Sequence, residues 1–140
     1  GSAMLRQLYF ATMDLELHSS VDNERGRGEG PAVFDIQRRV AERTTVLPPL
    51  PEDRFLCSFG HIFAGGYAAG YYSYKWAEVL SSDAFSRFED EGIFNQQVGN
   101  DFLTNVLEMG GSKEPSELFK AFRGREPEID ALLRHSGITG

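Results

Sequence analysis

The chain has 140 residues, of which 41% are hydrophobic and 25% are charged, an ordinary composition for a globular protein with one modest core. Its formal net charge of −7 argues against a nucleic-acid surface, and no apolar run is long enough to cross a membrane. The single cysteine, Cys57, excludes an intramolecular disulfide and favours a reducing, cytoplasmic compartment.

The elements predicted along the chain are helices. Residues 1–3 look like an expression scar, and residues 4–140 are expected to form one all-α, irregular multi-helix domain. Apolar residues at helical spacing predict helices over 4–18, 32–46, 95–109, 112–122 and 127–135, and another from Tyr67 towards Phe88 with a kink or a new start at 81–83.

The segments between these helices are predicted from glycine, proline and charge. Residues 19–31 alternate glycine with charged residues and indicate an exposed loop, and Pro31 suits the first position of the next helix. Prolines at 48, 49 and 51 indicate an extended segment, either a stiff spacer or a ligand for an aromatic groove. Residues 54–63 are expected to form a short strand or a buried connection.

Three tyrosines form the most distinctive pattern in the chain. Tyr67, Tyr71 and Tyr74 have the spacing of one helical stripe about 60° wide. Phenols stay protonated at neutral pH, so such a stripe could donate hydrogen bonds to an anionic or carbonyl oxygen. The same spacing also fits rings packed in a core with their hydroxyls at its edge, and the pattern leaves both interpretations open.

The residues before the tyrosines favour the interpretation as a site. His61 lies just upstream, and the pair Gly65-Gly66 gives the backbone a freedom that packing does not require. Cys57 lies four residues before His61, but no third group is available to orient them, which argues against a cysteine nucleophile.

Metal binding by the chain itself is not expected. Its three histidines, His18, His61 and His135, are far apart, and there is no His-Glu-x-x-His or Cys-x-x-Cys motif.

Several runs of the chain together match one family. They are MDLELHS at 13–19, residues 47–80, FSRFEDEGIFN at 85–95, GGS at 110–112, LF at 118–119 and FRGREP at 122–127. These runs closely resemble the C-terminal part of the thimet oligopeptidase family of zinc metallopeptidases, over nearly the whole chain after residue 3. The resemblance implies a longer, mostly helical, two-lobed parent enzyme with a channel that admits short unstructured peptides.

The same resemblance implies what this chain lacks and what it supplies. The family holds zinc with a His-Glu-x-x-His motif and a further glutamate, which are absent here, so the chain is expected to bind no zinc and to be inactive alone. Tyr74, and next Tyr71, are implied to meet the substrate backbone or the oxyanion of the tetrahedral intermediate. The other loop residues are implied to contact substrate or to form a hinge: His61, Gly65, Gly66 and Tyr67.

Two kinds of partner follow from this interpretation. The missing, zinc-bearing parts of the parent would pack against this chain, and without them exposed apolar surface would favour self-association. The alternative is a free-standing helical module without catalysis, in which the tyrosines and the proline-rich segment bind a protein or peptide.

Overall fold

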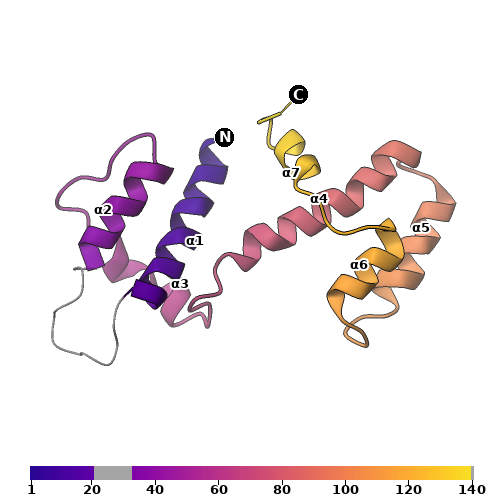
Figure 1. The fold of residues 1–140 in the computed structure, drawn as a ribbon, viewed down its shortest axis with the longest axis horizontal. Helices are drawn as coiled ribbons and strands as arrows, with labels where there is room; N and C mark the ends of the chain where they lie inside the picture. The colour runs from indigo at the N-terminus through magenta and orange to yellow at the C-terminus, as the bar shows by residue number, and fades with distance from the viewer. Residues whose placement is uncertain (21–32, 140) are drawn as a thin grey trace. The chain divides into compact units, whose positions relative to one another are not determined.

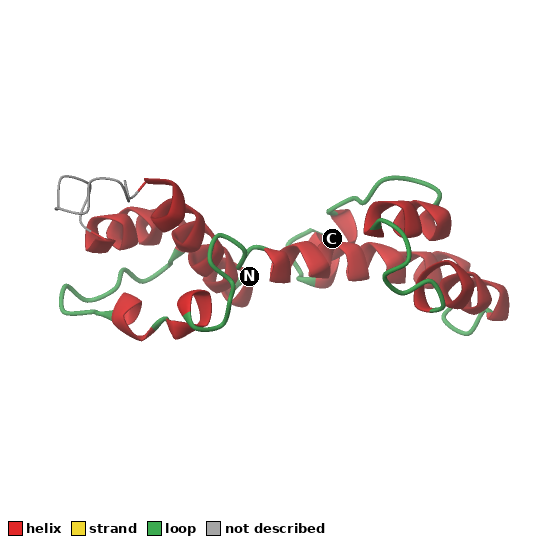
Figure 2. Cartoon of the chain, turned by 90° about the horizontal axis from the view of Figure 1, so that it is seen from below, coloured by secondary structure: helices red, strands yellow, loops and turns green. Residues whose placement is uncertain are grey.

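The computed structural model describes residues 1–20 and 33–139. These residues form helices and turns without any strand, which confirms the predicted all-α fold (Figure 2). Residues 21–31 of the expected loop, Pro31 included, lie outside the described residues. In chain order the elements are α1 (Ser2–Ser20), α2 (Val33–Thr44), the 3-10 turn η2 (Phe55–Ser58), α3 (Gly60–Phe63), α4 (Ser73–Glu91), α5 (Gln96–Phe102), the π-helical turn η3 (Leu103–Leu107), α6 (Pro115–Arg123) and α7 (Asp130–His135).

Some local predictions are wrong. The tyrosine helix begins at Ser73 rather than at Tyr67, because Ala69 has a φ of 54° and breaks the right-handed helical conformation. Helix α4 then continues through 81–83 without a new start, and Ser81 donates its hydroxyl proton to the Glu78 carbonyl inside the helix. Of the strand or buried connection expected over 54–63, the strand is wrong, because these residues form η2 and α3. The helix expected over 95–109 is divided between α5 and η3.

The chain divides into two compact units, residues 1–74 and residues 75–140, a division that the sequence did not indicate. The first unit contains α1, α2 and α3, and the second contains most of α4 with the elements that follow it (Figure 1). Each unit has its own apolar interior.

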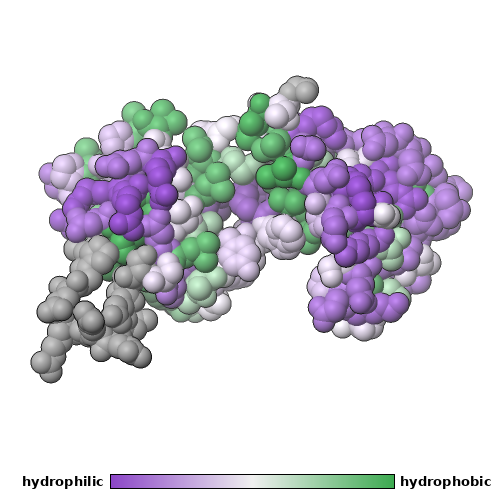
Figure 3. Space-filling view, viewed as in Figure 1, coloured by the Kyte–Doolittle hydropathy of each residue, from purple (hydrophilic) through white to green (hydrophobic). Residues whose placement is uncertain are grey.

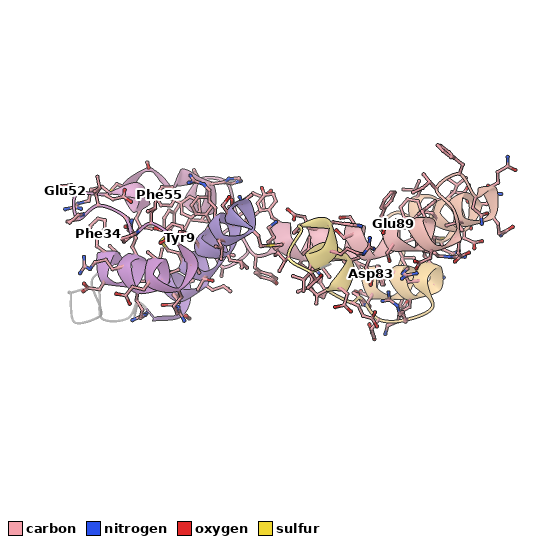
Figure 4. All side chains as sticks on the ribbon, turned by 90° about the horizontal axis from the view of Figure 1, so that it is seen from above. Tyr9, Phe34, Glu52, Phe55, Asp83 and Glu89 are labelled. Atoms are coloured by element: carbon pink, nitrogen blue, oxygen red, sulfur yellow. The ribbon has the colours of Figure 1, made fainter. Side chains whose placement is uncertain are left out.

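In the first unit, α1 packs against α2. Helix α2 is amphipathic, and Ile36, Val40 and Ala41 on one face are buried against the core. Glu16 on α1 pairs with Arg39 and Arg43 on the exposed side of the same contact. Aromatic rings fill the rest of the interior, as for the rings of Tyr9 and Phe55, whose centroids are 6.2 Å apart (Figure 4). The core residues are Tyr9, Phe10, Ala11, Met13, Ile36, Val40, Ala41, Phe59, Ile62 and Tyr71.

In the second unit, α6 presents Leu118, Phe119 and Phe122 to the interior. The Phe122 ring lies 5.2 Å from that of Phe102 and 6.0 Å from that of Phe88, between centroids. The visible face of α5 and α6 is largely hydrophilic (Figure 3).

Asp83 is the one buried acid on α4 among the described residues (Figure 4). It accepts hydrogen bonds from Arg123, from Arg125 and from the Glu128 N–H, at 2.6 to 3.1 Å. Burial alone would raise the pKa of Asp83, but the hydrogen bonds from Arg125, Glu128 and Arg123 outweigh it and hold the pKa below its ordinary value. This cluster ties the segment after α6 to α4.

Candidate functional site

The three tyrosines of the predicted stripe lie close together, but they do not share one helical face as expected. Tyr67 and Tyr71 lie in the turns before α4, and only Tyr74 belongs to its first turn. Their rings nevertheless form one cluster, because the Tyr74 centroid is 5.1 Å from that of Tyr67 and 5.1 Å from that of Tyr71. A compact turn, not a helical face, brings them together.

His61 joins this cluster from the last residues before the turn. Its ring centroid is 5.0 Å from that of Tyr67 and 5.6 Å from that of Tyr71. Its Nε2 atom lies 3.0 Å from the Tyr74 hydroxyl oxygen, within hydrogen-bond distance. We call His61, Tyr67, Tyr71 and Tyr74 the tyrosine cluster.

The hydroxyls of the cluster differ in their surroundings. Tyr71 is only 7% exposed, its ring packs in the core, and its hydroxyl donates to the Gln7 side-chain oxygen at 3.1 Å. Tyr74 is 37% exposed. Both interpretations of the tyrosine pattern therefore apply, each to a different residue. Tyr71 is a core residue with its hydroxyl at the edge, and Tyr74 presents an accessible hydroxyl.

The cluster raises the pKa of the Tyr74 hydroxyl. The neighbouring Tyr67 hydroxyl, together with partial loss of water around the group, raises the pKa of Tyr74 from 10.0 to about 12. Burial likewise raises the pKa of Tyr71. Both groups are thus neutral hydrogen-bond donors at physiological pH, as a partner for a carbonyl or oxyanion must be.

Gly65 and Gly66 are required by the geometry that links His61 to the turn. A Cβ on Gly65 would lie 2.3 Å from the carbonyl oxygen of His61, which no ordinary side chain tolerates. Gly66 has a φ of 77°, in the left-handed region. Hinge motion at this pair stays a prediction.

One residue of this region was missed by the sequence analysis. Asp14 on α1 is fully buried, and its two carboxylate oxygens accept the N–H groups of Ala69 and Tyr71, each at 2.9 Å. His18, one turn later on α1, places Nδ1 3.0 Å from the same carboxylate. The available signal was an acid on the helix face that also carries Phe10, a buried core residue.

The described residues do not bring together three histidine, cysteine, aspartate or glutamate side chains in an arrangement that could hold a metal ion. The zinc implied by the family resemblance therefore has no ligand set in the part of the chain that the structure describes. None of the described helices is both long and apolar enough to span a membrane.

Comparison with known proteins identifies the family of the chain. Peptidase family M3 matches residues 1–138, so the chain belongs to that family of peptidases. It is 56% identical over 142 aligned residues to the probable cytosolic oligopeptidase A of Arabidopsis thaliana, covering 99% of this chain and 20% of the relative. It is 54% identical to oligopeptidase A of Salmonella typhimurium, covering 98% and 20%, and 34% identical to a thimet-like oligopeptidase of Dictyostelium discoideum, covering 96% and 19%.

These similarities confirm the resemblance to the oligopeptidases seen in the sequence. The chain spans about a fifth of the length of these relatives.

Proposed function

We propose that this chain is the C-terminal portion of a zinc-dependent oligopeptidase that hydrolyses short peptides. Within that enzyme the tyrosine cluster lines the substrate channel, and Tyr74 donates a hydrogen bond to the oxyanion formed when water attacks the scissile carbonyl. The observation that carries the proposal is the accessible Tyr74 hydroxyl, held 3.0 Å from His61 in a chain of peptidase family M3.

The hydrogen bond between His61 and Tyr74 has two proton arrangements. With Nε2 unprotonated, the Tyr74 hydroxyl donates to His61 and its proton is engaged. With Nε2 protonated, His61 donates to the Tyr74 oxygen, and the hydroxyl proton is free to point at a substrate oxygen. The second arrangement is the one that stabilises an oxyanion, because the donor is then preorganised where charge develops.

Tyr71 and Tyr67 have supporting roles in this proposal. The Tyr71 hydroxyl is already bonded to Gln7, so it meets substrate only by exchanging that partner. Tyr67 sits against both His61 and Tyr74, where it contacts substrate and raises the pKa of Tyr74.

The zinc of the proposed enzyme has to be supplied by the rest of the parent polypeptide. We accordingly propose that the isolated chain has no peptidase activity and that the rest of the parent packs against it. The cytoplasmic location also stays a prediction.

The test is Tyr74→Phe in the parent polypeptide, which removes the hydroxyl and keeps the ring. Losing one oxyanion donor is expected to lower kcat by about 100- to 1,000-fold, with KM little changed. Cleavage of a quenched fluorescent peptide measures both constants, with zinc content checked. Tyr72→Phe is the matched control, because Tyr72 is 50% exposed and lies outside the tyrosine cluster. Wild-type activity of the Tyr74 variant would refute the proposal.

A further inference from the structure

We infer that Asp14 is a positioning residue for the tyrosine cluster: its buried carboxylate holds the backbone of residues 69–71 and thereby sets the place of Tyr74. This inference rests on the proposed function of Tyr74 and adds a residue from a distant helix to it. Asp14 lies on α1, 55 residues before Ala69 and 57 residues before Tyr71 in the sequence.

Both oxygens of the Asp14 carboxylate accept hydrogen bonds from the turn. One oxygen accepts the Ala69 N–H and the other accepts the Tyr71 N–H, each at 2.9 Å, and Asp14 has no exposed surface. Charge-assisted hydrogen bonds of this kind are about twice as strong as neutral ones. Two of them on one residue fix both the position and the orientation of the peptide units between Ala69 and Tyr71.

The turn needs such an anchor because its backbone is strained. Ala69 has a φ of 54°, the only positive value at a non-glycine residue among the described ones, and this left-handed conformation is sterically unfavourable for a residue with a Cβ. The Asp14 carboxylate stabilises it by accepting the N–H of that same residue.

A continuous hydrogen-bonded path leads from Asp14 to Tyr74. The N–H of Tyr71 donates to Asp14, and the carbonyl of Tyr71 accepts the N–H of Tyr74 at 3.3 Å. Through these hydrogen bonds, the position of Asp14 determines where α4 starts and where the Tyr74 ring lies relative to His61.

His18 in turn holds the acid. Its Nδ1 atom is 2.8 Å from the main-chain oxygen of Asp14 and 3.0 Å from a carboxylate oxygen. His18 is one helical turn from Asp14 on the same helix, and its ring contacts Oδ1, the carboxylate oxygen that also accepts the Ala69 N–H, so it helps to hold the Asp14 side chain in place.

The first experiment measures the anchor directly by amide hydrogen exchange in this chain. The Ala69 and Tyr71 amides are expected to exchange more slowly than those of Ala68 and Tyr72, whose N–H groups have no acceptor among the described residues. Equal exchange at these four positions would overturn the inference without any substitution.

Asp14→Asn then replaces one acceptor by an amide donor that faces an N–H. Exchange at Ala69 and Tyr71 should become about 10- to 100-fold faster, while exchange in the α2 core is unchanged. Asp35→Asn, an exposed acid paired with Arg38, is the matched control and should change neither amide. Unchanged exchange at Ala69 and Tyr71 in the Asp14 variant would overturn the inference.

The second experiment asks whether the anchor acts through Tyr74, using the parent polypeptide. Asp14→Asn is expected to lower kcat by about 10- to 100-fold with KM little changed, because small misplacements of a catalytic group have effects of this size. In the Tyr74→Phe background the same substitution should lower kcat by less than about 3-fold, since the hydroxyl it positions is gone.

The outcomes separate the two proposals. If Tyr74→Phe lowers kcat and Asp14→Asn has the same effect in both backgrounds, the positioning role is refuted and the proposed function stands. If Tyr74→Phe retains wild-type activity, the proposed function fails, and the inference about Asp14 fails with it.

Discussion

The Nε2 atom of His61 and the hydroxyl of Tyr74 lie 3.0 Å apart, although a turn of glycine, alanine and tyrosine residues separates them in the chain. Both residues belong to the first compact unit, so the pair forms within that unit. The Tyr67 hydroxyl beside them raises the pKa of Tyr74. This arrangement can be tested in the chain itself, before any activity is measured.

Tyr67→Phe should lower the pKa of Tyr74 from about 12 towards its ordinary value of 10.0. At about pH 11, Tyr74 should therefore remain mainly neutral in the wild-type chain and become mainly ionised in the variant. Nuclear magnetic resonance of Cζ-labelled tyrosine follows each ring separately. Tyr72→Phe, which lies outside the tyrosine cluster, should leave the Tyr74 titration in place. A Tyr74 pKa unaffected by Tyr67→Phe would contradict the assigned cause.

Ala69→Gly should stabilise the first unit by about 1 kcal/mol, because glycine adopts a φ of 54° without the steric cost that alanine pays. Urea denaturation of this chain measures the change. Ala68→Gly is the matched control and should be neutral or mildly destabilising, since only the greater freedom of the unfolded chain then counts. Destabilisation by Ala69→Gly would mean that backbone strain is not the main cost at this position.

Asp83→Asn should destabilise the second unit by about 3 kcal/mol, because it removes a buried charge that three partners satisfy and takes from Arg123 and Arg125 the buried carboxylate that both contact. Urea unfolding followed by circular dichroism and by Trp76 fluorescence gives the free energy. Asp90→Asn, an exposed acid on the same helix, is expected to change it by less than about 0.5 kcal/mol. A similar loss in both variants would show that the buried cluster does not determine stability.

The ion pair of Glu89 predicts the response of the second unit to acid. Arg134, and next His135, lower the pKa of Glu89 from 4.5 to about 2. A depressed carboxylate pKa contributes stability that is present above the unfolded value and is lost as pH falls through the folded value. The stability difference between the wild type and Glu89→Gln should therefore shrink as pH falls from about 4.5 to about 2.

Thermal unfolding at a series of pH values measures that difference. Arg134→Gln removes the guanidinium partner of Glu89 and should give a stability difference that shrinks over the same pH range but by less, because His135 still contacts Glu89. A stability difference that stays constant down to about pH 2 would argue against the pair.

Helix periodicity predicted the elements well where apolar residues repeat over several turns. The helix over 4–18 corresponds to α1, and the buried face of α2 follows Ile36 and Val40. The prediction failed at Tyr67, because a tyrosine spacing compatible with a helix is also compatible with a turn. There the conformation depends on the positive φ of Ala69, which cannot be predicted from the residue type.

The sequence by itself determined the all-α class, the family and the residues of the tyrosine cluster. Apolar periodicity is a local property, and the glycine-tyrosine motif is specific enough to identify relatives. Only the tertiary structure decided that Tyr71 is buried and bonded to Gln7 while Tyr74 is accessible, and that Asp14 holds the turn. Those facts depend on α1 packing against residues far along the chain, and spacing along the sequence carries no information about such contacts.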